Sequence, residues 1–435
     1  MDWKQEFEKK LVSVEEVAAQ IQTGDVIFTS ATISAPTCVI DAVVERVRAG
    51  LVEDIHFVGN QMLTRGKIVD AVDLVGKISY DTLFYDAFDR IGYKNHTVNV
   101  NSVHYGQVSR CLKQVYKPNV LLVEMCEPDE EGYVYFGASG GGFACSIVND
   151  VEKILVVINK YQHRAHSTAI PGIHISRIAA LCRNDHPMPV YQQPEVTELD
   201  LQVASHIVDL IPDGATIQIG RGGLANAIGY GLEKKKNLHV HSEILTDSLV
   251  DLAKMGVVTG VMRTGAAFGS QAVTDFCATD RVDIMPYEYI NDPNVIGSYE
   301  NFISINSCMM VDLTGQICSE AIGPRQYSST GGQLDYVKGA ALSKGGKSFL
   351  CLRSTHTDKA TGKVSSNILA TLPLGAVVTT PRSEVMYVVT EYGAVNLYLR
   401  PIEERIRLLI SIAHPDFREE LKREAIQAGV LRADP

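Results

Sequence analysis

The segment "IPDGATIQIGRGGLANAIGYGLEKK", residues 211–235, combines a turn, a strand pattern, a glycine loop and a helical pattern. Gly214 marks the turn, and the β-branched run after it predicts a strand of about five residues. The apolar spacing after the glycine loop predicts a helix. The segment "IQTGDVIFTSATISAPTCVIDAVVERV", residues 21–47, has the same plan and begins 190 positions earlier. Each segment continues into another strand pattern, DIHFVGNQ or LHVHSEIL. This repetition predicts a duplicated α/β domain.

Short β-branched runs alternate with helical patterns along the whole chain. They include DVIFTS, DIHFVG, VLLVEMC, KILVVIN, ATIQIG, LHVHSE, VDIMP, KSFLCL and VMYVVTE. Alternation of this kind is typical of βαβ units, so we expect two tandem open α/β/α domains with mainly parallel sheets. The polar, proline-bearing stretch at 183–200 is the natural boundary. We therefore predict an N-terminal domain at residues 1–190 and a C-terminal domain at residues 191–435.

The composition of the 435 residues excludes several classes of protein. Hydrophobic residues make up 46% and charged residues 21%, as in compact soluble proteins. The formal net charge of −11 argues against a nucleic-acid partner. No apolar run approaches the roughly 20 residues that span a bilayer, and the start MDWKQEFEKKLVS lacks the apolar core of a signal peptide. We expect a cytoplasmic protein without a membrane partner.

The nine cysteines are scattered, without a CxxC pair or a His/Cys pair at zinc spacing. In a chain of this length they are best interpreted as reduced thiols, and no metal site is expected.

Two glycine loops are candidates for ligand binding. Gly220, Gly222 and Gly223 lie between a strand pattern and a helical pattern, and Gly331 and Gly332 precede a second helical pattern. Glycine permits close approach of the backbone, and a helix N-terminus presents unpaired N–H groups. However, GxGG is not the GxGxxG nucleotide fingerprint, and no Walker ending follows this first loop. From the local sequence alone, ordinary tight turns explain both loops.

Glu243, in "NLHVHSEILTD", follows a strand-like run and is a candidate nucleophile. The carboxyl end of a parallel strand is where open α/β folds bind ligands. The chain has no GxSxG elbow and no cysteine with a catalytic signature, so no competing nucleophile is evident. The local alternative is a plain turn residue. Asn306 follows another apolar run and is a candidate amide donor, although asparagine in this position is usually a turn residue.

Several strings occur in one order across residues 220–421: GRGGLANAI, HSEILTDSLVDL, SINSCMMVDLTGQICSE, GPRQYSSTGGQLDYVKGAALSKGGKS, VVTTPRSEVMYVVTEYGAVNLY and LISIAHPDFREEL. Together they resemble the acetyl-CoA hydrolase/transferase family, especially its branch of 4-hydroxybutyrate and butyryl-CoA:acetate CoA-transferases. TGDVIF, GNQ and EPDEEGYVYFG extend the resemblance more loosely into the N-terminal half.

The resemblance implies a site in a cleft between the two domains and a role for each matching residue. Glu243 is the implied catalytic glutamate, and Asn306 is the implied oxyanion donor together with a glycine-loop amide. The GxGG loop (Gly220, Gly222, Gly223) and the GGQ loop (Gly331, Gly332, Gln333) are the implied neighbours of the CoA thioester and pantetheine. Coenzyme A and acyl-CoA are then substrates and not permanent cofactors, and a homodimer or larger homo-oligomer is expected.

The implied reaction moves CoA between an acyl-CoA and a free carboxylic acid by a ping-pong mechanism. Glu243 forms an acyl-glutamyl anhydride and then a glutamyl-CoA thioester. One alternative is an acyl-CoA hydrolase on the same scaffold, and another is a non-catalytic ligand-sensing domain. The conventional substrates are acetate, butyrate or 4-hydroxybutyrate.

Arg221 stands where the family usually has a small or aliphatic residue. A guanidinium at this position would suit a dicarboxylic acyl group such as succinyl or itaconyl. The alternatives are that Arg221 points to solvent or binds a CoA phosphate. Ser248 also departs from the branch, which often has glycine there, and "LYLRPIEER" is a third departure.

Overall fold

The computed structural model of the chain describes residues 2–30, 32–192 and 194–432. Two compact units form, Met1–Gln192 with Val261–Ile290 and Gln193–Gly260 with Asn291–Pro435. The prediction of two consecutive domains, 1–190 and 191–435, does not include the return of residues 261–290 to the first unit. Aromatic packing explains part of this return, since the Tyr287 ring stacks on Phe143 with centroids 4.1 Å apart.

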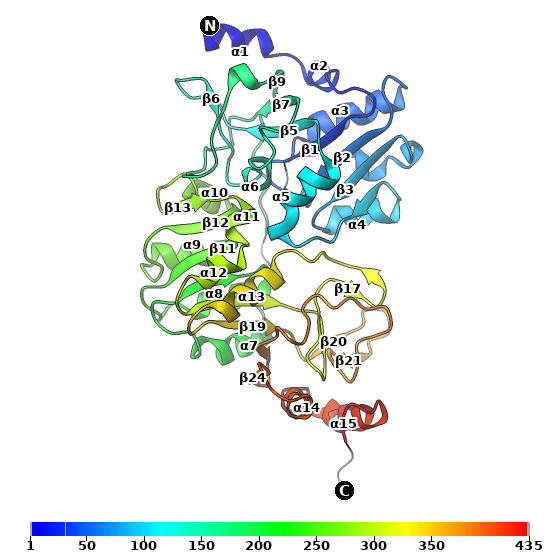
Figure 1. Ribbon diagram of the computed structural model, residues 1–435, viewed down its shortest axis with the longest axis vertical. Helices are drawn as coiled ribbons and strands as arrows, with labels where there is room; N and C mark the ends of the chain where they lie inside the picture. The colour runs from blue at the N-terminus through cyan, green and yellow to red at the C-terminus, as the bar shows by residue number, and fades with distance from the viewer. Residues whose placement is uncertain (1, 31, 193, 433–435) are drawn as a thin grey trace. The chain divides into compact units, whose positions relative to one another are not determined.

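The first unit contains a sheet in the strand order β4-β3-β2-β1-β5-β7-β9, and every pair in it is parallel. These strands run from the blue part of the ribbon in Figure 1 through cyan to the green of β9. Their bounds are β1 Val26–Thr29, β2 Ile55–Gly59, β3 Ile78–Thr82, β4 Val98–Val100, β5 Val120–Met125, β7 Lys153–Ile158 and β9 Ala180–Arg183. Every residue of β5 is buried, as expected for a central strand of a parallel sheet.

The core of the first unit forms where α3 (Thr37–Arg48) packs on this sheet. The apolar residues of α3 recur on one helical stripe and are buried together with residues of β1, β2 and β5. The other helices of the unit are α1 Trp3–Lys10, α2 Val14–Ala18, α4 Ala87–Lys94, α5 Val108–Cys111, α6 Gly141–Ala144, α10 Gln271–Phe276 and α11 Tyr287–Ile290. Its remaining strands are β6 Tyr133–Val134, β8 Ile173–His174, β12 Met262–Ala267 and β13 Val282–Ile284.

The second unit contains strands in the order β11-β10-β14-β19-β23-β24. All these pairs are parallel except the last, where β24 runs antiparallel to β23. The bounds are β10 Thr216–Ile219, β11 His239–Leu245, β14 Phe302–Ser307, β19 Lys347–Cys351, β23 Tyr387–Thr390 and β24 Gly393–Asn396. The predicted fold class, α/β with mainly parallel sheets, is confirmed.

The two repeated segments occupy equivalent places in their sheets. The segment at 21–47 forms β1 and α3, and the segment at 211–235 forms β10 and α8 (Gly223–Gly231). The turn glycines Gly24 and Gly214 both have positive φ, 87° and 75°. Each strand lies between the next strand of the chain and a later one, so the direction of the strand order changes beside it. Ligand sites of open α/β sheets lie at such positions.

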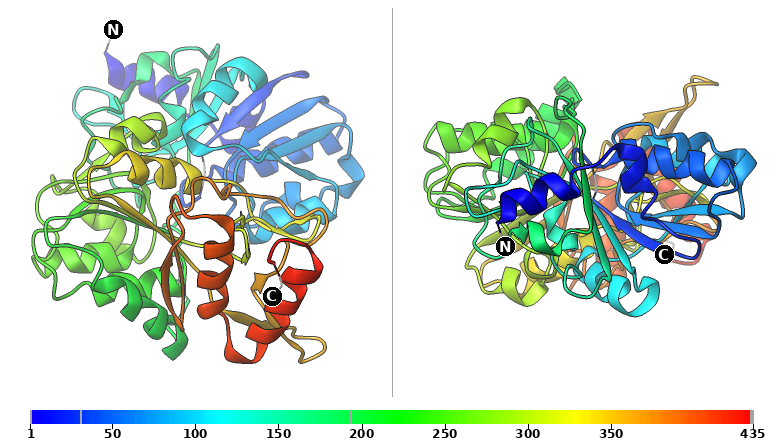
Figure 2. Two further views of the ribbon diagram at one scale, coloured as in Figure 1. Left: turned by 60° about the horizontal axis from the view of Figure 1, so that its bottom comes forward. Right: turned by 90° about the horizontal axis from the view of Figure 1, so that it is seen from above.

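The C-terminal part of the second unit adds small sheets and two helices. The helices α14 (Ile402–Ser411) and α15 (Arg418–Gln427) pack against each other (Figure 2) and close an apolar cluster with β23 and β24. The other helices are α7 Glu198–Val208, α9 Asp247–Lys254, α12 Pro293–Gly297 and α13 Gln333–Leu342. The short strands are β15 Met310–Asp312, β16 Ile317–Cys318, β17 Ala321–Ile322, β18 Arg325–Gln326, β20 Thr355–Thr357, β21 Val364–Ser366 and β22 Ile368–Leu369.

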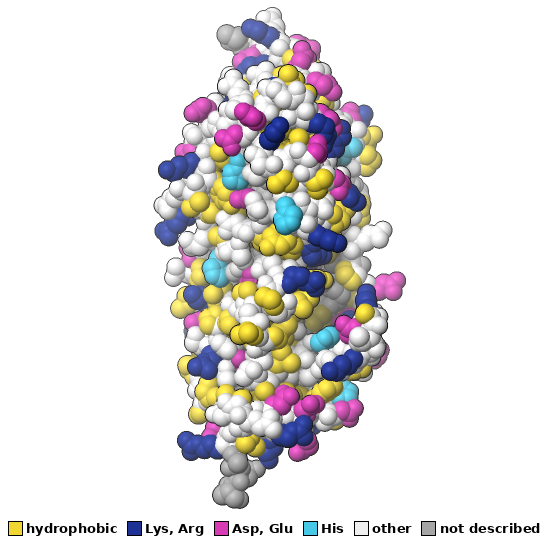
Figure 3. Space-filling model, turned by 90° about the vertical axis from the view of Figure 1, so that its right-hand side faces the viewer, with side chains coloured by type: hydrophobic (Ala, Val, Ile, Leu, Met, Phe, Trp, Pro, Cys, Tyr) yellow, Lys and Arg dark blue, Asp and Glu magenta, His cyan; other side chains and the backbone are white. Residues whose placement is uncertain are grey.

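One face of the molecule is mixed in charge. Acidic and basic side chains are interspersed on the face shown in Figure 3. Among the helices that the structure describes, none combines the length and the apolar character that crossing a bilayer requires.

Candidate active site

Glu243 lies near the carboxyl end of β11, as the strand pattern predicts. Strand β10 pairs in parallel with β11 on one side and with β14 on the other. Continuing both registers places Glu243 and Asn306 on opposite sides of Gly220. Neighbouring strands lie about 4.8 Å apart, so the backbones of Glu243 and Asn306 are about 10 Å apart. Both residues therefore lie at the edge of the sheet where open α/β folds bind ligands.

Three groups from distant segments surround the Glu243 carboxylate. Asn291 Nδ2 donates a hydrogen bond to Glu243 Oε2 at 2.8 Å, and the Gly332 N–H group also donates to this carboxylate. Asp335, in the first turn of α13, contributes a second carboxylate, which lies 3.5 Å from the same Asn291 amide nitrogen. A carboxylate that accepts two fixed donors is held in one orientation.

The Gly332 backbone approaches the carboxylate so closely that no side chain fits between them. A Cβ atom added at Gly332 would lie 1.9 Å from Glu243 Oε2 and 2.1 Å from Asn291 Nδ2. Glycine is therefore required at this position by close approach, since the φ of −98° is open to any residue. Its neighbour Gly331 has a positive φ of 58° and shapes the turn before α13.

Burial is the main influence on the ionisation of Glu243. Burial and the nearby Asp335 charge raise the pKa of Glu243, and the net value is about 7. The Asn291 hydrogen bond, the Arg221 charge and the Gly332 N–H group oppose this rise in the pKa. The site thus holds a partly buried carboxylate whose pKa is near neutral and which is supplied with donors.

The GxGG loop brings Arg221 within electrostatic reach of Glu243. Gly222, with a φ of 116°, caps the N-terminus of α8. The other two glycines allow close packing. A Cβ atom added at Gly220 would lie 3.2 Å from Asn306 Oδ1, and one added at Gly223 would lie 3.1 Å from the Glu195 carbonyl oxygen. Ser248 lies elsewhere, buried in α9 against α8, where its Oγ would be 2.5 Å from a Cβ atom at Gly229.

Two predicted site residues have their side chains engaged with other groups. The Asn306 amide exchanges hydrogen bonds with Gln218 at 3.1 Å and also donates to Ser304 Oγ at 3.0 Å. Gln333 is buried and donates to Thr380 Oγ1 at 2.9 Å. The role of Asn306 as an oxyanion donor stays a prediction.

Sequence reasoning missed Asn291 and Asp335. Asn291 stands before Asp292 and Pro293 and has the pattern of a turn residue. Asp335 lies in the first turn of a helix, where acidic residues are common for electrostatic reasons. Neither position carries a local signal of chemistry, and only their approach to Glu243 in space reveals them.

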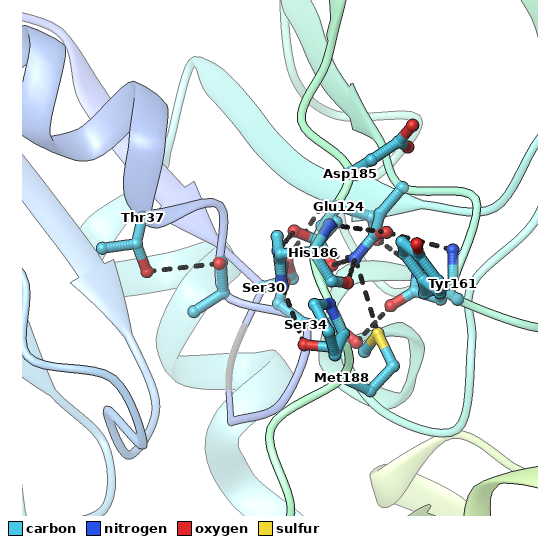
Figure 4. Close-up of polar contacts among 12 residues, drawn as sticks. Ser30, Ser34, Thr37, Glu124, Tyr161, Asp185, His186 and Met188 are labelled. Carbon is cyan, nitrogen blue, oxygen red and sulfur yellow. Dashed lines mark hydrogen bonds and ion pairs between the residues drawn. The ribbon is translucent and has the colours of Figure 1, made fainter.

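The first unit contains a separate buried carboxylate, Glu124 on β5 (Figure 4). His186 Nε2 lies 2.9 Å from Glu124 Oε2, and Asn159 Nδ2 donates to Glu124 Oε1 at 3.1 Å. The hydrogen bond with Glu124 raises the pKa of His186 to about 9, so the pair is ionic at neutral pH. His186 belongs to the polar stretch that leaves the first unit, and the ion pair attaches this stretch to β5.

Comparison with known proteins shows the family of the chain. Residues 1–211 match the profile of the acetyl-CoA hydrolase/transferase N-terminal domain, and residues 269–425 match that of the C-terminal domain. The chain belongs to the acetyl-CoA hydrolase/transferase family. The family resemblance expected from the sequence is confirmed, and so is the enzyme class, a CoA-transferase.

Members of this family align with the chain over nearly its whole length. The 4-hydroxybutyrate coenzyme A transferase of Clostridium kluyveri is 32% identical, over 98% of this chain and 99% of that protein. The butyryl-CoA:acetate CoA-transferase of Anaerostipes caccae is 33% identical, over 99% of each. The crystal structure of RipA from Yersinia pestis superposes with a TM-score of 0.91 at 30% identity and covers 99% of this chain and 100% of that one.

Proposed function

We propose that the protein moves CoA from an acyl-CoA to a free carboxylic acid by a ping-pong mechanism in which Glu243 is the nucleophile. The observation that carries this proposal is the partly buried Glu243 carboxylate, which Asn291 and the Gly332 N–H group hold by hydrogen bonds. Family membership supports an acyl-CoA as the substrate. We also propose that the protein acts in the cytoplasm as a homodimer or larger homo-oligomer.

The first half-reaction has two steps, and each step forms one bond and breaks another at a carbonyl carbon. The Glu243 carboxylate attacks the thioester carbonyl, the C–S bond breaks, and CoA leaves as a thiolate while an acyl-glutamyl anhydride forms. The thiolate then attacks the Glu243 carbonyl carbon and expels the acid as a carboxylate, which leaves a glutamyl-CoA thioester. No net proton is transferred, so no general base is needed.

The donors around Glu243 suit the second attack. When the thiolate adds to the Glu243 carbonyl carbon, negative charge develops on a Glu243 oxygen. The Asn291 amide already donates to Glu243 Oε2, and the Gly332 N–H group is directed at the same carboxylate. Preorganised donors of this kind are worth roughly 10²- to 10³-fold in rate each. An incoming carboxylate then reverses both steps and leaves as the new acyl-CoA.

Borohydride trapping tests the covalent intermediate. Enzyme incubated with acyl-CoA and then with borohydride should lose activity, and mass spectrometry should locate a reduced side chain at Glu243. Glu243→Ala should lose at least about 10³-fold in activity and trap nothing. A Glu243→Ala variant that still exchanges CoA would overturn the proposal.

Acceptor dependence separates a transferase from a hydrolase on this scaffold. In a transferase, steady release of CoA from acyl-CoA requires an added carboxylic acid, because water is kept from the glutamyl-CoA. Steady release without any acceptor would instead identify a hydrolase.

For the acyl group we propose a dicarboxylic acid of the succinyl or itaconyl type over acetate, butyrate or 4-hydroxybutyrate. The support is the position of Arg221, whose charge acts on the Glu243 carboxylate and therefore borders the place where the acyl group reacts. A guanidinium pairs with a carboxylate through two parallel hydrogen bonds. Arg221→Ala should therefore lower kcat/KM for succinyl-CoA by at least about tenfold more than for butyryl-CoA. An equal loss with both donors would reject this preference and leave Arg221 as a group that favours ionised Glu243.

A further inference from the structure

Another carboxylate of the same unit, Glu320, contacts the segment that leads to Gly332 through Thr330. Glu320 follows β16 and is only 2% exposed. Its side chain accepts hydrogen bonds from Gln326 Nε2 at 3.0 Å, Thr330 Oγ1 at 3.2 Å and Thr379 Oγ1 at 3.0 Å. A buried carboxylate that accepts several donors at once links the segments that carry those donors.

These bonds tie the segment before the GGQ loop to a single anchor. The Glu320 carbonyl oxygen also accepts the backbone N–H groups of Tyr327 and Ser328, at 2.8 Å and 3.0 Å. Thr330 is two residues from Gly332, and the intervening Gly331 adopts a left-handed conformation. Without an anchor, a stretch with two successive glycines would sample many backbone conformations.

The C-terminal end of the loop, at Gln333, is fixed by Thr380, the residue after Thr379. Thr379 joins the Glu320 cluster, and Thr380 accepts the Gln333 side-chain hydrogen bond at 2.9 Å. The segment at 379–380 is itself paired by its backbone with Ile317 of β16. The turn at Gly331–Gly332 is therefore held on both sides, by Thr330 before it and Gln333 after it.

We propose that Glu320 is a positioning residue that holds the Gly331–Gly332 turn so that the Gly332 N–H group is directed at the Glu243 carboxylate. This inference rests on the proposed function of Glu243 as the nucleophile. Glu320 acts through Thr330 and the loop. The physical reason for such an anchor is that a small displacement of a donor greatly weakens its hydrogen bond to the reacting oxygen.

The test compares Glu320→Gln and Thr330→Val with wild type in kcat, KM and the pH dependence of kcat/KM. Glu320→Gln directs an amide group at the donors, and Thr330→Val removes one hydroxyl donor with little change in volume. Both should lower kcat by about tenfold to hundredfold with a smaller change in KM, because the donor is displaced but not removed. Both should also move the acid limb of kcat/KM to higher pH, since the Gly332 N–H group favours the ionised carboxylate.

Two further variants make the comparison specific. Thr330→Ser keeps the hydroxyl and should restore most of the activity lost in Thr330→Val. Thr357→Val makes the same change at an exposed position of β20 and should match wild type. Thr330→Val also carries the test if Glu320→Gln does not fold.

The outcomes distinguish this inference from the proposed function. An active Glu243→Ala variant would overturn the assignment of Glu243 and this inference with it. An inactive Glu243→Ala variant combined with wild-type kcat and pH dependence in Glu320→Gln and Thr330→Val would overturn only the role of Glu320. A loss of kcat without movement of the acid limb would also overturn it, because a merely structural effect would produce that result.

Discussion

The side-chain amide of Asn291 donates a hydrogen bond of 2.8 Å to the carboxylate of Glu243, across 48 positions of the chain. Asn291 comes from the turn before α12, whereas Glu243 comes from β11. The fold thus brings a hydrogen-bond donor to the partly buried Glu243 carboxylate from a distant segment that carries no recognisable motif.

Replacing Asn291 by alanine should impair the chemistry more than the binding of substrate. Because the amide donates to the oxygen on which charge develops, we expect kcat to fall by about 10²- to 10³-fold. The pKa of Glu243 should rise, because a hydrogen bond that lowers it is lost. Steady-state kinetics at several pH values measure both effects. Asn294→Ala, at an exposed asparagine three residues further along, is the matched control. Equal kinetics in the two variants would contradict the role of Asn291.

The activity of the wild type should follow the ionisation of Glu243. Only the carboxylate is nucleophilic, and burial raises the pKa of Glu243 to about 7, so kcat/KM should fall as the pH decreases through about 7. An acid limb near pH 4.5, the ordinary value for glutamate, would show that the site does not desolvate this group.

Asp335→Asn should move the same acid limb in the opposite direction from Asn291→Ala. The Asp335 charge raises the pKa of Glu243, so its removal should shift the limb to lower pH. Glu300→Gln, at a residue whose side chain is 69% exposed, should leave the limb in place. A limb that does not move in Asp335→Asn would mean that Asp335 is uncharged in the working enzyme.

Gly332→Ala should inactivate the enzyme without a comparable loss of stability. The new methyl group would lie within 2.1 Å of Glu243 Oε2 and Asn291 Nδ2, so the two side chains must separate. Because the φ of −98° is open to alanine, the backbone itself is not strained. We expect kcat to fall at least 10²-fold, by roughly the loss of one donor. Gly231→Ala is the control, since its methyl group would meet only a Val208 methyl group at 3.0 Å. Thermal unfolding and kinetics of both variants check the prediction, which fails if Gly332→Ala keeps wild-type kcat.

The fold class could be predicted because its signals are local, whereas the role of Glu243 came from the family resemblance and stays a prediction. The repeated turn, strand and helix pattern reports each βαβ unit within about 30 residues, and Glu243 stands at the end of such a strand. The return of residues 261–290 to the first unit rests on contacts distant in sequence, such as Tyr287 on Phe143 and Thr168 with Asp283, and no local pattern reports them. Asn291 and Asp335 were missed for the same reason, since a turn asparagine and a first-turn aspartate are ordinary in their own segments.

Removing His186 should destabilise the first unit in a pH-dependent manner. In wild type, His186 forms an ion pair with the buried Glu124 at 2.9 Å, and His186→Ala would leave this carboxylate with Asn159 as a remaining donor. Leaving a buried charge without its partner is costly. The His186 side chain is 33% exposed, so we expect a loss of about 2 kcal/mol, below the range for fully buried pairs.

The sign of the pH effect follows from the raised pKa of His186. A histidine whose pKa is higher in the folded state adds its full stabilisation below the unfolded value of about 6.5 and loses it as the pH rises through about 9. The difference in Tm between wild type and His186→Ala should therefore be largest near pH 6 and smaller at pH 10. His163→Ala is the control, because His163 faces Asp275 in an exposed pair with side chains 55% and 51% accessible, and such pairs contribute little. A Tm difference that stays constant from pH 6 to pH 10 would show that the charge of His186 does not stabilise the fold.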